Sequence, residues 1–320
     1  MTLVIKIGGA AGTVTENIIH EIAQLVAEGQ RLVLLHGGSD LTNTLSQRLG
    51  HPVRTITSPS GMVSRYTDRE TLRIYAMAVA GQINTELVAL LQQQGVNALG
   101  LSGVDGRLLQ ARRKSFVRSM TTEGRVQILH DDYTGQIEQV NEALLRQLID
   151  AGYTPVIAPL ALSREGEPLN IDGDRAAAAV AVALQADALV MLTNVPGLLT
   201  DPENNATLVS TIPADQLAEY MHYAQGRMRK KILGAQEALQ GGVPRVYIGS
   251  VSLQKVLNGS GTLIESTQIP LERKSLEAIP ATKLSLLFES HLSNEASAST
   301  YGQDRCKELP TVSRDERKLV

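Results

Sequence analysis

Short apolar runs rich in β-branched and aliphatic residues alternate with longer amphipathic runs through most of the chain. The apolar runs predict strands at residues 3–7, 31–35, 97–101, 154–158, 188–192 and 245–248. The amphipathic runs predict helices at residues 15–28, 67–94, 136–151, 175–184 and 228–240, the second of them broken near Gly81. Strands and helices that alternate in this way are typical of a mostly parallel sheet with helices on both faces. The sequence therefore predicts an α/β fold, a three-layer αβα sandwich.

Glycines mark the ends of four predicted helices and can adopt the left-handed conformation that closes a helix. These glycines are Gly29, Gly95, Gly152 and Gly241. Residues 106–130 depart from the alternation and predict β-hairpins, with Glu123-Gly124 as a turn.

The last residues have a different composition from the rest. Residues 271–320 are rich in Ser, Glu, Lys and Arg and follow a final predicted strand at 262–264. We therefore expect one domain at residues 1–265 and a largely disordered or loosely docked tail at 271–320.

Composition limits the classes of protein to consider. The chain has 320 residues, 43% hydrophobic and 20% charged, so it can bury a sizeable core. Its net charge of -3 gives no global attraction to nucleic acid or membranes, and we expect neither as a partner. The lone cysteine, Cys306, cannot form an intramolecular disulfide. With no signal segment or long apolar run recognised, we expect a cytoplasmic protein.

Two predicted strands end in glycine turns that could bind an anion. Gly8-Gly9 follows the first strand, and Gly37-Gly38-Ser39 follows the second. Backbone N–H groups in such turns can point at a phosphate, at the sheet edge where α/β proteins bind ligands. Lys6 lies inside the otherwise apolar first strand, where an unpaired ammonium is costly, so it predicts a fixed anion nearby. Neither GxGxxG nor GxxxxGK[ST] is present, which argues against a dinucleotide fold and a P-loop.

The second half supplies further polar residues around predicted helix starts. Asn170-Ile171-Asp172-Gly173-Asp174 precedes an alanine-rich helix, and a polar turn from Thr193 follows the strand at 188–192. Residues 227–231 carry four cations at the start of a helix, where cations oppose the macrodipole unless an anion is present.

These motifs together resemble those of the amino-acid kinases, and in particular the acetylglutamate kinase branch. The resemblance covers about residues 3–264. It rests on six motifs in the same order, namely Lys6-Ile7-Gly8-Gly9, His36-Gly37-Gly38, Arg65-Tyr66-Thr67-Asp68, Asn170-x-Asp-Gly-Asp174, Leu192-Thr193-Asn194-Val195-Pro196-Gly197 and Gly226-x-Met-x-x-Lys231. In that family the first half, here about residues 1–170, holds the acyl substrate, and the second half, here about 171–265, holds ATP.

The resemblance implies a role for each matching residue. Lys6 and Lys231 would neutralise the transferred phosphoryl group, and Asp174 would orient both. The substrate would be held by Gly37, Gly38, Ser39, Arg65 and Asn170. The ATP phosphates and nucleotide would be held by Gly8, Gly9, Thr193, Asn194 and Gly197. A carboxylate acceptor is already anionic, so this chemistry needs no general base; Mg²⁺ would arrive with ATP, and we predict no metal site formed by the protein's own side chains.

Two departures from the acetylglutamate kinases resemble a sister family, the LysW-aminoadipate kinases of lysine biosynthesis. Ser39 follows the two glycines where a third glycine is usual, and the segment 63–72 is also similar to that family. Their substrate is attached to a small acidic carrier protein. Residues 107–118 contain five cations and no acid, which could steer such a carrier. We therefore predict docking through Arg112, Arg113, Lys114 and Arg118.

Several alternatives stay open from the sequence. Carrier-bound aminoadipate and glutamate differ by one methylene, and Tyr66 is a candidate to distinguish them. An acetylglutamate kinase of arginine biosynthesis would need no basic hairpin. A non-catalytic nucleotide-sensing or partner-binding protein is the rival from another class. The resemblance also implies a homodimer joined through helices of the first half.

Overall fold

The fold is known from a computed structural model that describes residues 1–10, 15–250 and 252–266, all within one compact unit of the chain. Its main sheet runs in the order β14 (Thr211–Pro213), β16 (Thr262–Glu265), β15 (Arg245–Gly249), β13 (Ala188–Leu192), β1 (Thr2–Ile7), β2 (Arg31–His36), β10 (Thr154–Ala158) and β5 (Ala98–Ser102). Among these described strands, only β15 and β16 pair antiparallel.

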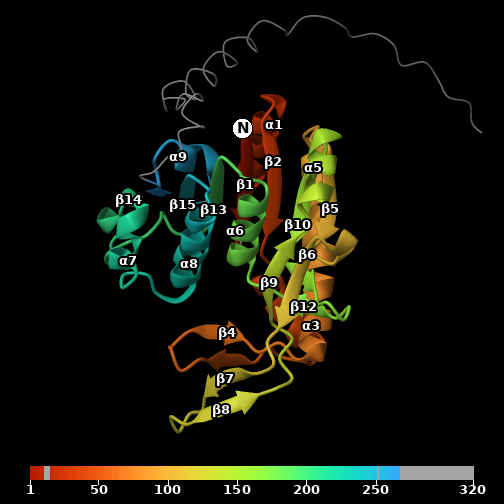
Figure 1. Cartoon of the computed structure of the whole chain (residues 1–320), viewed down its shortest axis with the longest axis vertical. Coiled ribbons are helices and arrows are strands. Elements are labelled where there is room, and N and C mark those ends of the chain that lie inside the picture. Colours follow the sequence, from red (N-terminus) through yellow and green to blue (C-terminus); the bar gives the residue numbers. More distant parts are fainter. Residues whose placement is uncertain (11–14, 251, 267–320) are drawn as a thin grey trace, which may run out of the picture. The chain divides into compact units, whose positions relative to one another are not determined.

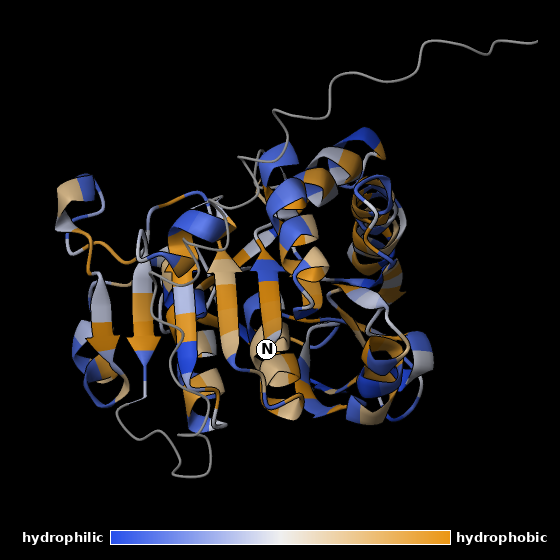
Figure 2. Ribbon diagram, turned by 90° about the horizontal axis from the view of Figure 1, so that it is seen from above, coloured by the Kyte–Doolittle hydropathy of each residue, from blue (hydrophilic) through white to orange (hydrophobic). Residues whose placement is uncertain are grey.

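Helices cover both faces of this sheet (Figure 1). One face packs against α1 (Glu16–Ala27), α4 (Asn84–Gln93) and α9 (Leu253–Leu257). The other packs against α5 (Glu142–Asp150), α6 (Gly173–Ala183) and α8 (Gly226–Gln240). Because side chains alternate along a strand, Val4 of β1 joins one core and Ile5 the other. Figure 2 shows the resulting apolar strands between amphipathic helices, and the predicted three-layer sandwich is confirmed.

Smaller sheets extend from the carboxyl ends of the main strands. One runs in the order β12 (Pro168–Asn170), β11 (Leu160–Leu162), β6 (Leu109–Arg113) and β9 (Gly135–Val140). Two hairpins pair β3 (Thr55–Thr57) with β4 (Val63–Arg65), and β7 (Val117–Met120) with β8 (Val126–Leu129). The predicted turn between β7 and β8 is present, with Gly124 at φ +77°.

The remaining helices lie around these sheets. They are α2 (Ser39–Arg48), α3 (Arg69–Ala76), the π-helical segment Met77–Ile83, α7 (Leu217–Tyr220), and short 3₁₀ turns at Asp105–Arg107, Asn205–Thr207 and Ala214–Gln216. The run Arg69–Gln93 is long and apolar enough to span a membrane by length and composition alone. Its residues Leu87 and Leu91 lie in the core beside the sheet, as is typical of a core helix in a folded domain.

The structure corrects three details of the sequence prediction. Residues 136–140 belong to strand β9 and not to the helix, because they pair with β6. Gly241 has φ -81°, and the left-handed glycine after α8 is Gly242, at φ +92°. The run at 67–94 is not broken near Gly81 but continues through one π-helical segment. The predicted tail at 271–320 lies outside the described residues.

The glycine turns after β1 and β2 touch each other through their backbones. A Cβ on Gly9 would lie 2.4 Å from the nitrogen of Gly38, and a Cβ on Gly37 would lie 2.6 Å from the nitrogen of Gly9. Parallel pairing of β1 with β2 brings the two strand ends to this point. Any side chain at either position would push the turns apart.

Gly9→Ala is therefore expected to destabilise the fold by about 1–3 kcal/mol, the usual cost of inserting an atom into a filled space. Thermal and urea unfolding measure the change. Gly81→Ala is the matched control, because the position has open space around it and ordinary backbone angles; it should be neutral or slightly stabilising. Equal stabilities for the two variants would contradict the tight contact between the turns.

Candidate active site

A cleft of about 1070 Å³ opens at the carboxyl ends of β1, β2 and β13. Its walls include the turns that follow these strands and the amino-terminal ends of α2, α6 and α8. The positive ends of three helix dipoles therefore face one space, which favours a bound anion.

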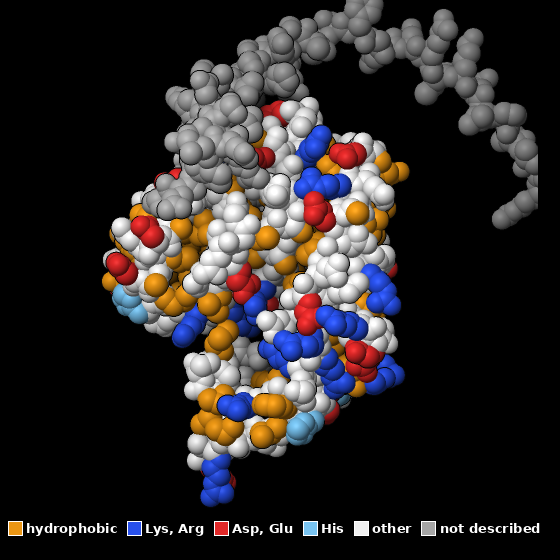
Figure 3. All heavy atoms as spheres, in the orientation of Figure 1, with side chains coloured by type: hydrophobic (Ala, Val, Ile, Leu, Met, Phe, Trp, Pro, Cys, Tyr) orange, Lys and Arg blue, Asp and Glu red, His pale blue; other side chains and the backbone are white. Residues whose placement is uncertain are grey.

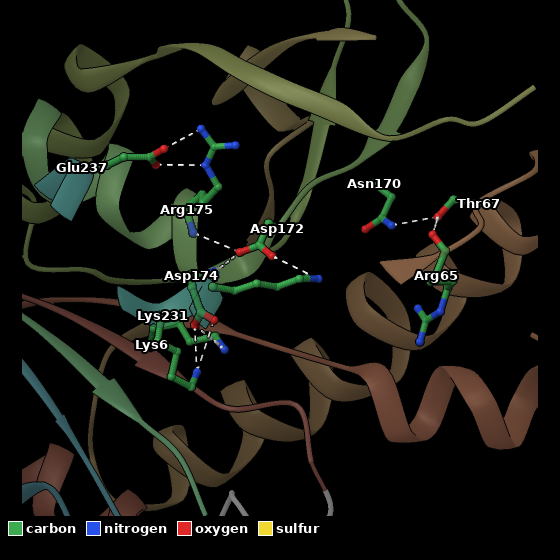
Figure 4. Close-up of polar contacts among 10 residues, drawn as sticks. Lys6, Arg65, Thr67, Asn170, Asp172, Asp174, Arg175, Lys231 and Glu237 are labelled. Atoms are coloured by element: carbon green, nitrogen blue, oxygen red, sulfur yellow. Dashed lines mark hydrogen bonds and ion pairs between the residues drawn. The ribbon is translucent and has the colours of Figure 1, made fainter. Parts of the chain in front are cut away.

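Two lysines share one carboxylate at the inner end of this cleft (Figure 4). Lys6 Nζ lies 2.8 Å from Asp174 Oδ1, and Lys231 Nζ lies 3.0 Å from the same oxygen and 3.3 Å from Oδ2. All three side chains are buried. Lys6 comes from the central strand β1, Asp174 from the first turn of α6 and Lys231 from α8. The structure thus brings together the three residues predicted to be catalytic.

The electrostatics of this trio leave an excess positive charge. Burial lowers the pKa of Lys231 to about 8, and repulsion from Lys6 adds to that effect against the attraction of Asp174. Burial also acts to lower the pKa of Lys6, but Asp174 and Asp172 outweigh it and raise the pKa above its usual value. Burial would raise the pKa of Asp174, yet the two ammonium groups hold it well below its usual range. One carboxylate therefore serves two ammonium groups, and the site is ready for a further anion.

A pair of opposite charges, Asp172 and Lys230, lies beside the trio. Asp172 caps α6, since its Oδ1 accepts hydrogen bonds from the backbone N–H groups of Asp174 and Arg175 at 3.0 and 3.2 Å. Its Oδ2 lies 3.8 Å from Lys230 Nζ, and both residues line the cleft. The cap fixes the helix start that presents Asp174 to the two lysines.

The guanidinium of Arg65 faces the cleft near the start of α2. It donates hydrogen bonds to Ser39 O at 3.1 Å and Asn43 Oδ1 at 3.0 Å, and lies over the ring of Tyr75. Its Nε is buried without a hydrogen-bond partner among the described residues. The residue lines the cleft, and a planar guanidinium there suits a bound carboxylate.

Asn170 ends β12 and also lines the cleft. Its amide donates a hydrogen bond to Thr67 Oγ1 at 2.9 Å. Thr67 is held in turn by Asp132, whose carboxylate accepts from the Thr67 backbone N–H at 3.0 Å. These bonds fix Asn170 near the strand that presents Arg65 (Figure 4).

Most of the other predicted ligand-binding residues line the same cleft. They are Gly8, Gly9, Gly37, Gly38, Ser39, Thr193 and Asn194. The Gly8 N–H is already donated to Leu192 O, at 3.1 Å, whereas no partner within the described residues is recorded for the N–H groups of Gly9 and Gly38. The structure does not bring Gly197 to this cleft: it packs against Thr262 and Leu208.

The predicted docking cations lie outside the cleft and differ in surroundings. Arg112, Lys114 and Arg118 are exposed, with Arg112 Nε 3.2 Å from Glu138. Arg113 is turned inward: its Nε donates to Asp132 O at 3.0 Å, and its guanidinium stacks 3.8 Å above the Tyr133 ring. Figure 3 shows basic side chains mixed with acidic ones in this part of the molecule and apolar side chains grouped near the β7–β8 hairpin.

Tyr66 does not line the cleft. Its hydroxyl donates to Asp131, and its ring is covered by Arg54. Tyr75, by contrast, lines the cleft.

The cleft also contains residues for which the sequence alone predicts no role, among them Asn43 and Asp172. A signal for Asn43 was available, because residues i and i+4 of a helix share a face and Ser39 was already a candidate. Within the described part of the chain, no group of three or more His, Cys, Asp or Glu is placed to hold a metal ion.

Comparison with known proteins agrees with this geometry. The profile of the amino acid kinase family matches residues 1–250. A [LysW]-aminoadipate kinase from Thermus thermophilus is 47% identical over 268 residues, which cover 82% of this chain and 99% of that protein. An acetylglutamate kinase from Desulfitobacterium hafniense is 38% identical, covering 77% of this chain and 83% of that one.

Among solved structures, smu.665 from Streptococcus mutans superimposes with a TM-score of 0.68 at 28% identity, over 82% of this chain and 98% of that one. The match of the family profile to most of the chain, together with relatives of such identity and coverage, establishes that this protein belongs to the amino acid kinase family.

Proposed function

We propose that this protein is an ATP-dependent kinase that phosphorylates the side-chain carboxylate of 2-aminoadipate carried on a small acidic protein, a step of lysine biosynthesis. The observation that carries the proposal is the buried trio Lys6–Asp174–Lys231, with one carboxylate for two ammonium groups. Identity of 47% with the Thermus kinase supports the choice of substrate.

Phosphoryl transfer to a carboxylate fits a site that supplies positive charge and orients the reactants but contains no general base. The acceptor carboxylate is ionised at neutral pH and attacks the γ-phosphorus; the bond from that phosphorus to the β–γ bridging oxygen breaks, leaving ADP and an acyl phosphate. Lys6 and Lys231 reduce repulsion between the two anions as they meet, and Asp174 holds both ammonium groups in place. Charge stabilisation of this kind is commonly the largest part of catalysis.

The cleft suggests where each reactant binds. We assign ATP to the side formed by Gly8, Gly9, Thr193 and Asn194, with the phosphates toward the N–H of Gly9, for which the described residues supply no partner. The substrate would lie toward Gly37, Gly38 and Ser39. Its α-carboxylate would accept hydrogen bonds from the guanidinium of Arg65, and its nitrogen side would lie at Asn170. Mg²⁺, which prefers oxygen ligands, would arrive with the ATP phosphates.

The carrier would dock beside the mouth of the cleft and not in it. The exposed cations Arg112, Lys114 and Arg118 offer a surface for an acidic partner. Arg113 contributes less to that surface, because its contacts with Asp132 and Tyr133 hold it against its own chain.

Two other readings remain as competitors. An acetylglutamate kinase is supported by the 38% identical relative, but it makes no use of the exposed cations. A protein that only binds nucleotide would have no use for two buried lysines on one carboxylate. We include carrier-bound glutamate as a second substrate, because one methylene is worth only about 1 kcal/mol in an apolar pocket.

The resemblance to the family also bears on the oligomeric state and the cellular location of the enzyme. We propose a cytoplasmic homodimer joined through helices of the first half. Met77 of the helical run Arg69–Gln93 is 51% exposed and offers an apolar side chain for such contact.

Lys6→Met and Lys231→Met are each expected to fold normally and to lose about a hundredfold in kcat, on the order of 3 kcal/mol of transition-state stabilisation. Either change leaves one ammonium paired with Asp174. Asp174→Asn is the contrasting variant, since it leaves two buried ammonium groups unpaired and should also lower the Tm. ATP turnover with carrier-linked aminoadipate, carrier-linked glutamate and N-acetylglutamate measures the effect, and near-normal turnover in either lysine variant contradicts the assignment.

The pH dependence should follow Lys231. Because the pKa of this lysine in the free protein is lowered to about 8, kcat/KM for ATP should be level near pH 7 and fall as pH rises through about 8, where the ammonium loses its proton. Lys231→Arg keeps the charge and should remove that alkaline fall, whatever its absolute rate. An unchanged alkaline limb in the arginine variant would assign the titration to another group.

Replacing Arg112, Lys114 and Arg118 together by Ser should weaken carrier binding at low salt and leave ATP binding unchanged. Isothermal titration at two salt concentrations measures both affinities. The control with equal charge loss replaces Arg31, Arg73 and Lys255, exposed cations on other elements. Equal losses of carrier affinity in the two triple variants would show a general charge effect and reject a docking surface at β6 and β7.

A further inference from the structure

His36 is a fully buried histidine at the end of β2, directly before the glycine turn of the cleft. Its Nδ1 lies 3.0 Å from Gly37 O, and its Nε2 lies 3.1 Å from Asn84 Nδ2. A carbonyl oxygen can only accept a hydrogen bond. Nδ1 of His36 therefore carries the ring proton and donates a hydrogen bond to Gly37 O. In a neutral ring Nε2 is then the acceptor for the amide of Asn84.

The ring is kept neutral by its surroundings. Burial lowers the pKa of His36 to about 4; the hydrogen bond to Gly37 opposes this shift, and the charge of Lys6 adds to it. At neutral pH the tautomer is therefore set by the two hydrogen bonds.

Asn84 is itself held in a closely fitting place. Its Nδ2 also donates to Val156 O at 2.9 Å, and a Cβ on Gly100 would come within 2.2 Å of its Oδ1. Asn84 follows the π-helical segment Met77–Ile83, whose Val79 and Ile83 press on Gly38: a Cβ there would lie 2.5 and 2.9 Å from their side chains. The π-helical turn thus faces the site, as such turns often do.

The hydrogen bond to Gly37 O fixes the direction of the next N–H group. In a trans peptide the carbonyl of Gly37 and the N–H of Gly38 point to opposite sides. With the carbonyl turned to the imidazole, the Gly38 N–H points away from it. This nitrogen lies beside Gly9, where the two turns of the cleft meet.

We infer that His36, held in one tautomer by Asn84, is a positioning residue that aims the Gly38 N–H at the group transferred in the cleft. It touches neither reactant and moves no proton. The inference deepens the proposed function and rests on it for the identity of the anion.

The test compares two replacements of His36 that differ in one donor. Leucine removes both hydrogen bonds, and kcat should fall about tenfold to a hundredfold. KM for ATP should change less, because a misdirected N–H group affects the rate of the chemical step more than it affects binding. Asparagine keeps an N–H donor at about the place of Nδ1 and should recover most of kcat, although both variants lose the contact with Asn84. Unfolding curves of both variants distinguish a loss of stability from a change in the direction of the Gly38 N–H.

Wild-type kcat in His36→Leu, or equal kcat in the folded leucine and asparagine variants, would overturn the inference. If the leucine variant does not fold, His36→Met takes its place, because it also fills the space without an N–H donor for Gly37 O, and wild-type kcat in that variant is the contrary result.

Nitrogen-15 NMR of the wild-type ring should show the proton on Nδ1 at neutral pH, and a proton on Nε2 alone would also overturn the inference. A wild-type protein with a proton on Nδ1 but no kinase turnover would instead refute the proposed function.

Discussion

The buried carboxylate of Asp174, shared by two ammonium groups, is the interaction on which the site depends. An uncompensated charge inside a protein is costly, and two lysines on one acid leave such a charge. The fold keeps this arrangement through close packing: Gly234 lets α8 approach α6, since a Cβ there would lie 3.1 Å from Asp174 O. Such an arrangement is reasonable only if an anion regularly enters the cleft and balances it.

The same cleft gathers the positive ends of α2, α6 and α8, which lie at the carboxyl ends of central strands. Each helix starts with little side-chain bulk: Gly38 precedes α2, and Gly173 and Gly226 begin the others. Backbone N–H groups can therefore approach a phosphate closely, and the dipoles add to the charge of the lysines. Catalysis by position and charge then needs no side chain that accepts a proton.

Local sequence pattern was sufficient for much of this architecture and failed where distant pairing decides. Strand β1, its glycine turn and Lys6 were predictable because an apolar run with one charged residue is unusual. The local pattern predicts a helix at residues 136–140, because only pairing with β6 makes them a strand. The basic run at 112–114 looked uniform, yet alternation along β6 turns Arg113 inward between two exposed cations. His36 could not be interpreted without Asn84, which lies 48 positions away.

Two separate sets of positive charge follow from this arrangement, and solvent treats them differently. The exposed cations of β6 and β7 act through water, where salt screens them within about 8 Å at physiological ionic strength. Lys6 and Lys231 are buried, so added salt reaches them far less. In the proposed function, the outer set would govern how fast an acidic carrier arrives, and the inner set would govern how fast the phosphoryl group is transferred. Added salt should therefore slow the association of the carrier with the kinase and leave kcat of the bound complex nearly constant. A small free substrate would not show this difference between the two rates.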